Sequence, residues 1–460
     1  MKVAFLNPPR VMERLTDDFA ISYNVSRFSR GVDIVYGVTP PTELAILAAA
    51  VKKKHEVAFC DANAHNMFAH EVCEWLRAQR PDFLVVRGGD ATLTADVMFY
   101  HYAEAMGIRA VLWEDTLNPL YSQRLMSDFR LKRVLYGEPE RKIFEILDGA
   151  EGLVGGDIIP DMDTLPQPLM DALPMERYVK EGRRNWYSFL QRGCGWGACA
   201  FCLIAPSDIT HRMRSIPHIK QELDMLKQRG VETIYFWDPQ INPSRERVRA
   251  LCDLFAQYPF KWEAWARVDI MDNELAAAMK RSGCFRLHLG VENGDDHVLK
   301  SINKGTTADM IRKAFRALRA HGIERAAYFC MGTPEESEDS FRRTMSLIRE
   351  IKPTTIVPAS YRPFPNVPLT DQARQAGMLV QDHYDLALDS DCFGTAAATR
   401  TRHMSAAQLS KWMDRMHALS TRIALRSYAF KPSVWKPYAR IFMVRAIRNR
   451  LVRRRTPHGQ

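Results

Sequence analysis

Three cysteines stand close together in the middle of the chain. Cys194, Cys199 and Cys202 follow the spacing C-x4-C-x2-C within a glycine-rich segment. Three thiolates on one loop can hold three irons of a cubane iron–sulfur cluster, while the fourth iron stays open to a substrate. Glycines let such a loop wrap around a bulky group without Cβ clashes. The residue types and their spacing therefore predict a catalytic 4Fe-4S cluster.

Zinc is the competing metal for this cysteine set. A structural zinc site takes four ligands, commonly two C-x2-C pairs or a mixture of cysteine and histidine. The segment offers a single C-x2-C pair, and His211 would have to complete a Cys3His site. The cysteines directly follow an expected strand, Tyr187–Gln191, and such a position favours catalysis over a structural role. The iron–sulfur interpretation is preferred, and zinc or simple buried thiols remain the alternatives.

A repeating strand–helix pattern would position this loop. Residues 186–370 contain six strand-like stretches with helical stretches between them, which predicts a partial (β/α)6 barrel. In such barrels the active site lies at the C-terminal ends of the strands. Charged residues stand at three of the expected ends, namely Asp238, Arg267 and Glu292. We expect these side chains to face the cysteine loop.

The first 150 residues also alternate between strand-like and helix-like stretches. This pattern predicts an α/β domain with a doubly wound parallel sheet of the Rossmann-like type. Ligands bind such sheets at the carboxyl ends of the strands. Asn7, Pro8 and Pro9 follow the first expected strand, and Glu138 follows the last one before a helix.

Two further regions are less regular. Residues 151–185 are rich in glycine, aspartate and proline, which predicts a linker between the two domains. Residues 371–460 form a mostly helical C-terminal region that ends in a basic tail.

The chain resembles radical S-adenosylmethionine enzymes of the subfamily that carries an N-terminal cobalamin-binding domain. The resemblance covers roughly residues 1–370. The family motif is usually C-x3-C-x2-C with an aromatic residue before the last cysteine; Phe201 matches that aromatic, and the first gap here is one residue longer. Further matches are spread over the barrel: Asp238, Arg267-Val268-Asp269, Leu289–Gly294, Lys304-Gly305-Thr306 and Met331–Glu336.

The resemblance implies a chemistry for the barrel. The open iron would chelate the amino and carboxylate groups of S-adenosylmethionine, and one electron would cleave it to a 5′-deoxyadenosyl radical. Asp238 would accept from the methionine ammonium and Glu292 from the ribose hydroxyls. Arg267 would steady the carboxylate or the substrate, and Phe201 would shield the cluster or pack against a ligand. Each charged residue has an alternative as a solvated or salt-bridged group at a strand end.

The resemblance also implies cobalamin in the N-terminal domain. Asn7, Pro8, Pro9 and the turn with Glu138 resemble the family's cobalamin-binding half. The D-x-H-x-x-G motif of enzymes that ligate cobalt through histidine is absent. Residues 113–115, Trp-Glu-Asp, stand where the family has paired glycines, so we expect a narrowed or reshaped pocket. The alternative is a domain kept for packing or for substrate binding.

The expected reaction is C-methylation of a small biosynthetic intermediate, including a hydrophobic one, with a flavodoxin or ferredoxin as electron donor. Ring formation, ring contraction or oxidation by the same apparatus is an alternative. A tRNA methylthiotransferase would need a further cysteine set, which Cys60 and Cys73 do not supply. A zinc-stabilised nucleic-acid-binding protein is the alternative from another class.

The charge of the chain is concentrated at its C-terminal end. The 460 residues carry 64 Lys+Arg and 54 Asp+Glu, and the segment from Arg415 onward has many of the basic residues and no acidic one. No apolar run reaches the roughly 18 residues of a membrane span. We expect a cytoplasmic protein whose tail, residues 435–455, is a solvated helix or contacts an anionic membrane. An RNA or another polyanion is the less favoured partner.

Overall fold

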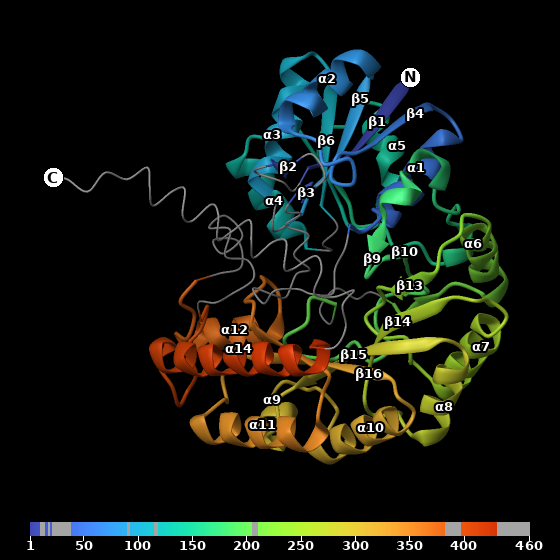
Figure 1. The fold of residues 1–460 in the computed structure, drawn as a ribbon. Helices are drawn as coiled ribbons and strands as arrows, with labels where there is room; N and C mark the ends of the chain where they lie inside the picture. Colours follow the sequence, from blue (N-terminus) through green and yellow to red (C-terminus); the bar gives the residue numbers. More distant parts are fainter. Residues whose placement is uncertain are drawn as a thin grey trace, which may run out of the picture.

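The structure, a computed structural model, describes residues 1–9, 14–16, 19–20, 38–89, 93–114, 118–204, 210–381 and 397–429. It contains two α/β units joined by a short connecting region, with helices at the C-terminal end of the described chain (Figure 1). The basic tail, residues 435–455, lies outside the described residues. Within the described residues, none of the helices combines the length and apolarity that a membrane crossing requires.

The N-terminal unit is built on a parallel sheet of six strands in the order β4-β1-β5-β6-β7-β8. The strands are β1 (Lys2–Asn7), β4 (Glu56–Asp61), β5 (Phe83–Arg87), β6 (Arg109–Glu114), β7 (Arg133–Tyr136) and β8 (Gly152–Gly155). The order of connection reverses between β1 and β5, which is the point where a sheet of this kind binds its ligand. The predicted doubly wound sheet is therefore confirmed.

Helices cover both faces of this sheet because successive residues of each strand point to opposite sides. Val3 and Phe5 pack in one apolar core, and Ala4 and Leu6 pack in another. The first core includes helices α1 (Thr42–Lys52) and α5 (Pro139–Leu147). The second includes α2 (Ala69–Gln79), α3 (Leu93–Ala105) and α4 (Pro119–Asp128).

The segment predicted as a linker contains more regular structure than expected. Strand β8 lies in it and pairs with β7, so the sheet continues past residue 151. Glycines hid this strand from sequence reasoning, since glycine is poorly represented in strands but tolerated at a sheet edge. Gly155, at φ +148°, closely approaches the Tyr136 carbonyl, and a Cβ would not fit there. Three short 3-10 turns follow: Met162–Thr164, Met170–Ala172 and Met175–Arg177.

The second unit is a sheet in the order β17-β16-β15-β14-β13-β10-β9 (Figure 1). Its strands are β9 (Val179–Lys180), β10 (Arg183–Ser188), β13 (Thr233–Phe236), β14 (Lys261–Ala266), β15 (Cys284–Glu292), β16 (Glu324–Met331) and β17 (Thr355–Ser360). From β10 to β17 each strand pairs in parallel with the next one along the chain, and β9 adds an antiparallel edge. This is the predicted partial (β/α)6 barrel.

Helices connect these strands on the outside of the curved sheet. They are α6 (Ile216–Gln228), α7 (Arg245–Phe255), α8 (Asn273–Arg281), α9 (Asp296–Ser301), α10 (Ala308–Ala320) and α11 (Glu338–Ile351). Serine or threonine side chains cap several N-termini, as Ser215 does for α6 and Thr307 for α10. Trp262 and Ala264 of β14 pack in the core beneath these helices, while the alternate residue Glu263 bonds to groups inside the barrel.

The described C-terminal region is helical, as predicted. Helix α12 (Pro368–Gln375) follows the barrel, and the long helix α14 (Ala406–Tyr428) lies against β17 (Figure 1). Ser420 donates a hydrogen bond to the Ile356 carbonyl at 2.6 Å, and Trp412 stacks on Phe341 with ring centroids 5.4 Å apart. Helix α14 thus closes the outer edge of the barrel.

Candidate cofactor-binding site

The cysteine loop follows the first barrel strand, as predicted, but that strand is β10, Arg183–Ser188, rather than Tyr187–Gln191. The loop starts from β11 (Gln191–Arg192), which forms a short hairpin with β12 (Arg212–Met213). Cys194, Cys199 and Cys202 are all half-buried and free of disulfides. Burial raises the pKa of Cys199 and raises that of Cys202 to about 11. Metal binding at these thiols would therefore release protons.

The described residues contain no group of three or more His, Cys, Asp or Glu side chains placed to hold one metal ion. His211, the residue that a zinc site would need, is instead hydrogen bonded through Nε2 to Gln191 Oε1 at 3.0 Å. The three thiols still lie within electrostatic range of one another. A donor set of three cysteines on one loop fits a cluster with an open iron.

A turn after α9 clamps the cysteine loop. The Trp196 indole Nε1 donates to the Asn303 carbonyl at 3.1 Å, and Asn303 Nδ2 donates to the Ala198 carbonyl at 2.8 Å. The Ala200 amide donates to the Ile302 carbonyl at 2.9 Å. Gly305, at φ +70°, packs so closely on the Trp196 ring that a Cβ would collide with it. The loop is thereby held without contribution from the thiols.

Glu292 stands at the end of β15 and pairs with Lys304. The Lys304 ammonium donates to Glu292 Oε1 at 2.8 Å and lies 5.9 Å from the centre of the Phe201 ring. Burial alone would lower the pKa of Lys304, but Glu292 and Cys199 raise it above its ordinary value. Glu292 has φ +61° beside an irregularity in the β15–β16 pairing. Left-handed backbone at a residue other than glycine is strained and clusters at functional sites.

Arg267, at the end of β14, reaches the same region. Its Nη2 donates to the Lys304 carbonyl at 2.9 Å and its Nε to Asp269 at 3.0 Å. The guanidinium lies over the Trp196 ring, 4.7 Å from its centre. Arg267 thus braces the cysteine loop against the turn that carries Lys304 and presents a positive charge beside it.

Asp238 is buried beneath the start of the cysteine hairpin. Its Oδ1 accepts hydrogen bonds from the Leu190 and Gln191 amides at 2.8 and 2.7 Å. Its Oδ2 is buried and has no hydrogen-bond partner among the described residues. Burial raises the pKa of Asp238 to about 7. The predicted contact with the methionine ammonium is untested, and the structure gives the side chain a role in shaping the backbone before the cysteines.

The carboxyl edge of the N-terminal sheet carries Asn7, Pro8 and Pro9, all buried. Asn7 Nδ2 donates to Asp61 Oδ1 at 2.7 Å, and the Tyr178 hydroxyl donates to Asp61 Oδ2 at 2.7 Å. Asn7 Oδ1 is buried without a hydrogen-bond partner in the part of the chain that the structure describes. An orphaned acceptor at the strand-order reversal fits a ligand with hydrogen-bond donors.

The side chain of Trp113, which was predicted to narrow this edge, points into the core of the domain. Trp113 is 2% exposed and packs in the core with Phe5 and Ile143. Its Nε1 donates to the Gly137 carbonyl at 3.2 Å, which fixes the ring inside the domain. The expectation of a pocket narrowed by Trp113 is therefore wrong, because strand alternation turns this side chain into the core. Glu114 is buried at the strand end, and Asp115 lies outside the described residues.

Glu138, predicted as a cofactor contact, joins the two units. Its carboxylate accepts from Arg212 Nη2 at 2.5 Å and from the Ile159 amide at 2.8 Å, and lies 3.3 Å from Arg192. Burial opposes ionisation, but the two arginines hold the pKa of Glu138 below its ordinary value. Arg192 also pairs with Glu140, at 2.5 and 3.1 Å. The cysteine loop begins right after Arg192, so these pairs tie it to the N-terminal unit.

Comparison with known proteins identifies the family to which the barrel domain belongs. Residues 188–348 match the family model described as the radical SAM superfamily, where SAM is S-adenosylmethionine. The chain contains a radical SAM domain. An uncharacterized methyltransferase of Pyrococcus horikoshii is 23% identical over 418 residues, which are 83% of this chain and 88% of that protein.

Two solved structures share the fold across both units. The radical S-adenosylmethionine methyltransferase TsrM from Kitasatospora setae matches with a TM-score of 0.64 and 15% identity, over 83% of this chain and 77% of its own. Structures of TsrM contain tryptophan substrate and a SAM analogue, or cobalamin and a [4Fe-4S] cluster. OxsB, solved with aqua-cobalamin and S-adenosylmethionine, matches with a TM-score of 0.61 and 15% identity, over 91% of this chain and 61% of its own.

Sequence reasoning missed three residues of the radical SAM domain that organise the site: Trp196, Asn303 and the pairing role of Lys304. Lys304 was visible only as part of the Lys304-Gly305-Thr306 match and Asn303 lay outside it, because the contacts that these residues make have no local signature. Cys60 and Cys73, considered for a second cysteine set, are buried in the N-terminal unit. Burial raises the pKa of Cys60 to about 12, so its thiol is a core group.

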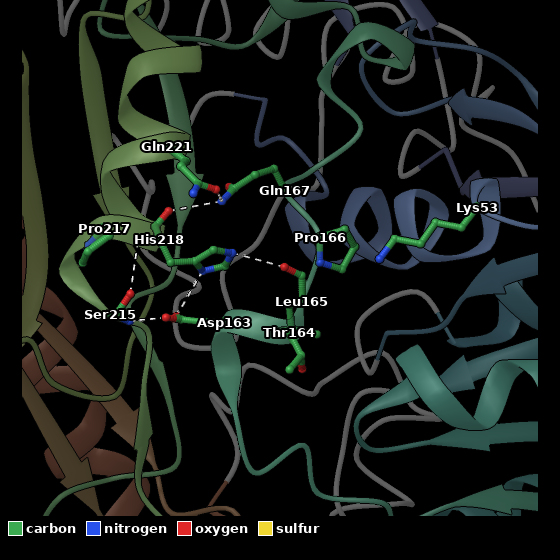
Figure 2. A pocket seen from close by; sticks show the side chains of 10 residues that line it. All are labelled: Lys53, Asp163, Thr164, Leu165, Pro166, Gln167, Ser215, Pro217, His218 and Gln221. Carbon is green, nitrogen blue, oxygen red and sulfur yellow. Dashed lines mark hydrogen bonds and ion pairs between the residues drawn. The ribbon is translucent and has the colours of Figure 1, made fainter.

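A separate cavity of about 390 Å³ lies away from the cysteine loop, between the end of α1 and the start of α6 (Figure 2). Its polar groups bond to one another: Asp163 accepts from the Ser215 amide at 2.8 Å, and His218 Nε2 bonds to the Leu165 carbonyl at 3.1 Å. Burial lowers the pKa of His218. None of the three cysteines lines this cavity, and we assign no cofactor to it.

Proposed function

We propose that this protein is a cobalamin-dependent radical SAM enzyme that methylates carbon in a small biosynthetic intermediate. The observation that carries the proposal is the clamped cysteine loop beside Glu292, Lys304 and Arg267, tied by buried ion pairs to a Rossmann-like sheet. When bound, the cluster with S-adenosylmethionine would supply a 5′-deoxyadenosyl radical, and cobalamin would supply a methyl group.

Different residues of the barrel would bind the cluster and S-adenosylmethionine. The three cysteines would hold the 4Fe-4S cluster, and Phe201, beside Lys304, would cover one side of it. Glu292 would accept from the ribose hydroxyls of S-adenosylmethionine, with Lys304 fixing the direction of its carboxylate. Arg267 would face the carboxylate of the same molecule or the substrate. Asp238 would position the backbone at Leu190 and Gln191 and present its second oxygen to the methionine ammonium.

The N-terminal sheet would hold cobalamin at its carboxyl edge. Asn7 would offer its unsatisfied Oδ1 to donor groups of the corrin side chains, and Pro8 and Pro9 would form an apolar wall. Glu138 contributes differently from our sequence-based expectation, since its carboxylate is taken up by Arg212, Arg192 and a backbone amide. We assign it to holding the cobalamin edge at a fixed position relative to the cysteine loop.

The relatives support methylation over the other radical outcomes. One is named a methyltransferase and spans most of this chain, and TsrM is a methyltransferase with the same arrangement of two units. Ring formation, ring contraction or oxidation without net methyl transfer is the alternative use of the same apparatus. A flavodoxin or ferredoxin would supply the electron. The protein would work in the cytoplasm, and its basic tail would provide any membrane contact.

The test uses full-length protein purified and reconstituted without oxygen. With dithionite and S-adenosylmethionine, we expect 5′-deoxyadenosine, a retained corrinoid absorption, and formation of S-adenosylhomocysteine that depends on added cobalamin. Cys199→Ala should lose formation of 5′-deoxyadenosine and of S-adenosylhomocysteine but keep the corrinoid, because the cobalamin edge lies in the other unit. Deoxyadenosine without any bound corrinoid would contradict the methyl-transfer proposal, and stoichiometric zinc without iron would contradict the radical SAM proposal altogether.

A further inference from the structure

The inside of the barrel is lined by a layer of aromatic rings. On β13, Ile234 and Phe236 pack outward in the core under the helices, so the alternate residue Tyr235 faces inward. The same alternation applies to the other strands. The layer, which we call the ring layer, consists of Tyr187, Tyr235, Trp237, Trp265, His288 and Tyr328.

These rings form one continuous surface across five strands. Tyr235 lies 4.9 Å from Tyr187 and 5.0 Å from His288, measured between ring centres. Trp265 lies 4.2 Å from Tyr328 and 5.4 Å from His288. Trp237 completes the surface, 5.3 Å from Tyr235 and 6.4 Å from Trp265. Such spacings are those of interacting aromatic pairs.

Charged residues close the barrel on the side of the ring layer that faces the N-terminal ends of the strands. Glu263 pairs with Lys180, with Arg286 at 3.1 Å, and with His288 at 3.1 Å. All four side chains are buried. Burial opposes ionisation of Glu263, yet Lys180 and Arg286 hold its pKa well below the ordinary value. A ligand would therefore enter from the opposite side, where the strands end.

The ring layer is open on that side. Trp237 is 38% exposed, and Tyr187 and Trp265 are half-buried, whereas the outward-facing Trp186 and Trp262 are at most 1% exposed. An exposed indole inside a concave barrel wall is typical of a ligand site, because ligand pockets are lined by aromatic side chains with few polar groups.

The open side faces the cofactor residues. Trp265 of β14 lies two residues before Arg267, which directly follows that strand, and His288 precedes Gly290 and Glu292 on β15. Two residues of a strand span about 7 Å. The ring layer thus lies one inward-facing level below Arg267 and two levels below Glu292, which we assign to S-adenosylmethionine.

One polar group in the layer has a defined hydrogen-bond direction. His288 Nε2 bonds to Glu263 Oε2 and its Nδ1 to the Tyr328 hydroxyl, both at 3.1 Å. An ionised carboxylate only accepts, so His288 Nε2 carries a hydrogen toward Glu263, and burial lowers the pKa of His288, which favours the neutral ring. In this tautomer Nε2 carries the ring hydrogen, and Nδ1 accepts the hydrogen of the Tyr328 hydroxyl. A phenolic oxygen that donates its hydrogen in this way can still accept one.

We propose that the ring layer is the substrate-binding surface, and that the substrate is a planar aromatic or conjugated molecule with a hydrogen-bond donor at its edge. The plane would stack on Trp237 and Trp265, and the donor would bond to Tyr328. This inference rests on the proposed function, since it uses the cofactor residues above the layer to place the reacting atom. Glu263 and His288 act as positioning residues for Tyr328.

The test compares two probes that share a hydroxyl donor and differ in their π-system, 2-naphthol and decahydro-2-naphthol. Both are titrated by calorimetry into full-length, cluster-reconstituted protein with S-adenosylmethionine present. We expect 2-naphthol to bind at least tenfold more tightly. Trp237→Leu should remove most of that preference, because its ring supplies the exposed stacking face. Tyr328→Phe should weaken both probes about fivefold, as loss of one hydrogen bond does.

Trp75→Leu is the matched control, since Trp75 is a partly buried indole on α2 of the other unit. It should leave both affinities unchanged. Equal affinity for the two probes, or an unchanged preference in Trp237→Leu, would overturn the inference. Cluster content and 5′-deoxyadenosine are measured on the same samples. If the cluster is loaded and active but the protein shows no preference for the aromatic probe, only this inference is contradicted. If the protein binds no cluster, the proposed function is contradicted as well.

Discussion

At the scale of single residues, Asp238 shows how a charged strand end can serve the site through the backbone. One oxygen accepts two amide hydrogens just before the cysteine hairpin, and the other has no partner among the described residues. A carboxylate in this position is poorly solvated, which is why its pKa rises to about 7. The side chain therefore titrates within the physiological range.

Asp238→Asn should change how stability depends on pH. Because the pKa of Asp238 is raised in the folded state, the native protein binds more protons than the unfolded chain from about pH 4 to pH 7. Its contribution is thus fully present below about pH 4 and lost as pH rises through 7, by up to about 4 kcal/mol. Asparagine keeps an acceptor for both amides and does not titrate. The thermal midpoint of the variant relative to wild type should rise steadily over this pH range; parallel profiles would contradict the assignment.

At the scale of elements, the strand and helix pattern could be predicted because buried parallel strands and amphipathic helices have strong periodicities. The pattern predicts helices over Asn273–Arg281 and Glu338–Ile351 and a strand over Arg133–Tyr136, and α8, α11 and β7 have these bounds. Strands β8 and β9 were missed, because glycine-rich or two-residue edge strands carry no such periodicity. The clamp on the cysteine loop was missed for another reason, since Trp196 bonds to a backbone carbonyl 107 residues away.

Gly305 tests this clamp. Gly305→Ala would place a methyl group at φ +70° and against the Trp196 ring. Gly322→Ala is the matched control, because Gly322 has φ +64° but its Cβ would meet nothing closer than Lys280 Nζ at 4.0 Å. Both variants should lose about 1–2 kcal/mol from left-handed backbone strain. Only Gly305→Ala should also lose iron after reconstitution and gel filtration. Equal iron content in the two variants would show that the clamp does not hold the loop.

At the scale of the whole molecule, buried ion pairs join the two units. Glu138 and Glu140 come from the start of α5, and Arg192 and Arg212 from the cysteine hairpin. Sequence reasoning located Glu138 at a strand end of the N-terminal sheet and interpreted it as a cofactor contact. It could not find the partners, because pairing across 74 residues depends on how the two sheets dock and leaves no local pattern.

Glu138→Gln should destabilise the protein, because it leaves Arg212 buried with a reduced partner. Removing one member of a buried pair costs about 3–5 kcal/mol. Asp309→Asn, which removes an exposed pair with Lys313 on α10, is the matched control and should change little. Urea unfolding of the full chain measures both. A midpoint for Glu138→Gln equal to that of the control would mean that the ion pairs do not hold the units together.

The central claim is that three cysteines hold a cluster with an iron open to S-adenosylmethionine. The most direct measurement is the electron paramagnetic resonance spectrum of the dithionite-reduced, anaerobically reconstituted protein, recorded with and without S-adenosylmethionine. We predict about four irons per chain, a spectrum that changes when S-adenosylmethionine is added, and loss of the signal in Cys199→Ala. A cluster spectrum that S-adenosylmethionine leaves unchanged, or protein that binds one zinc and no iron, would contradict the account.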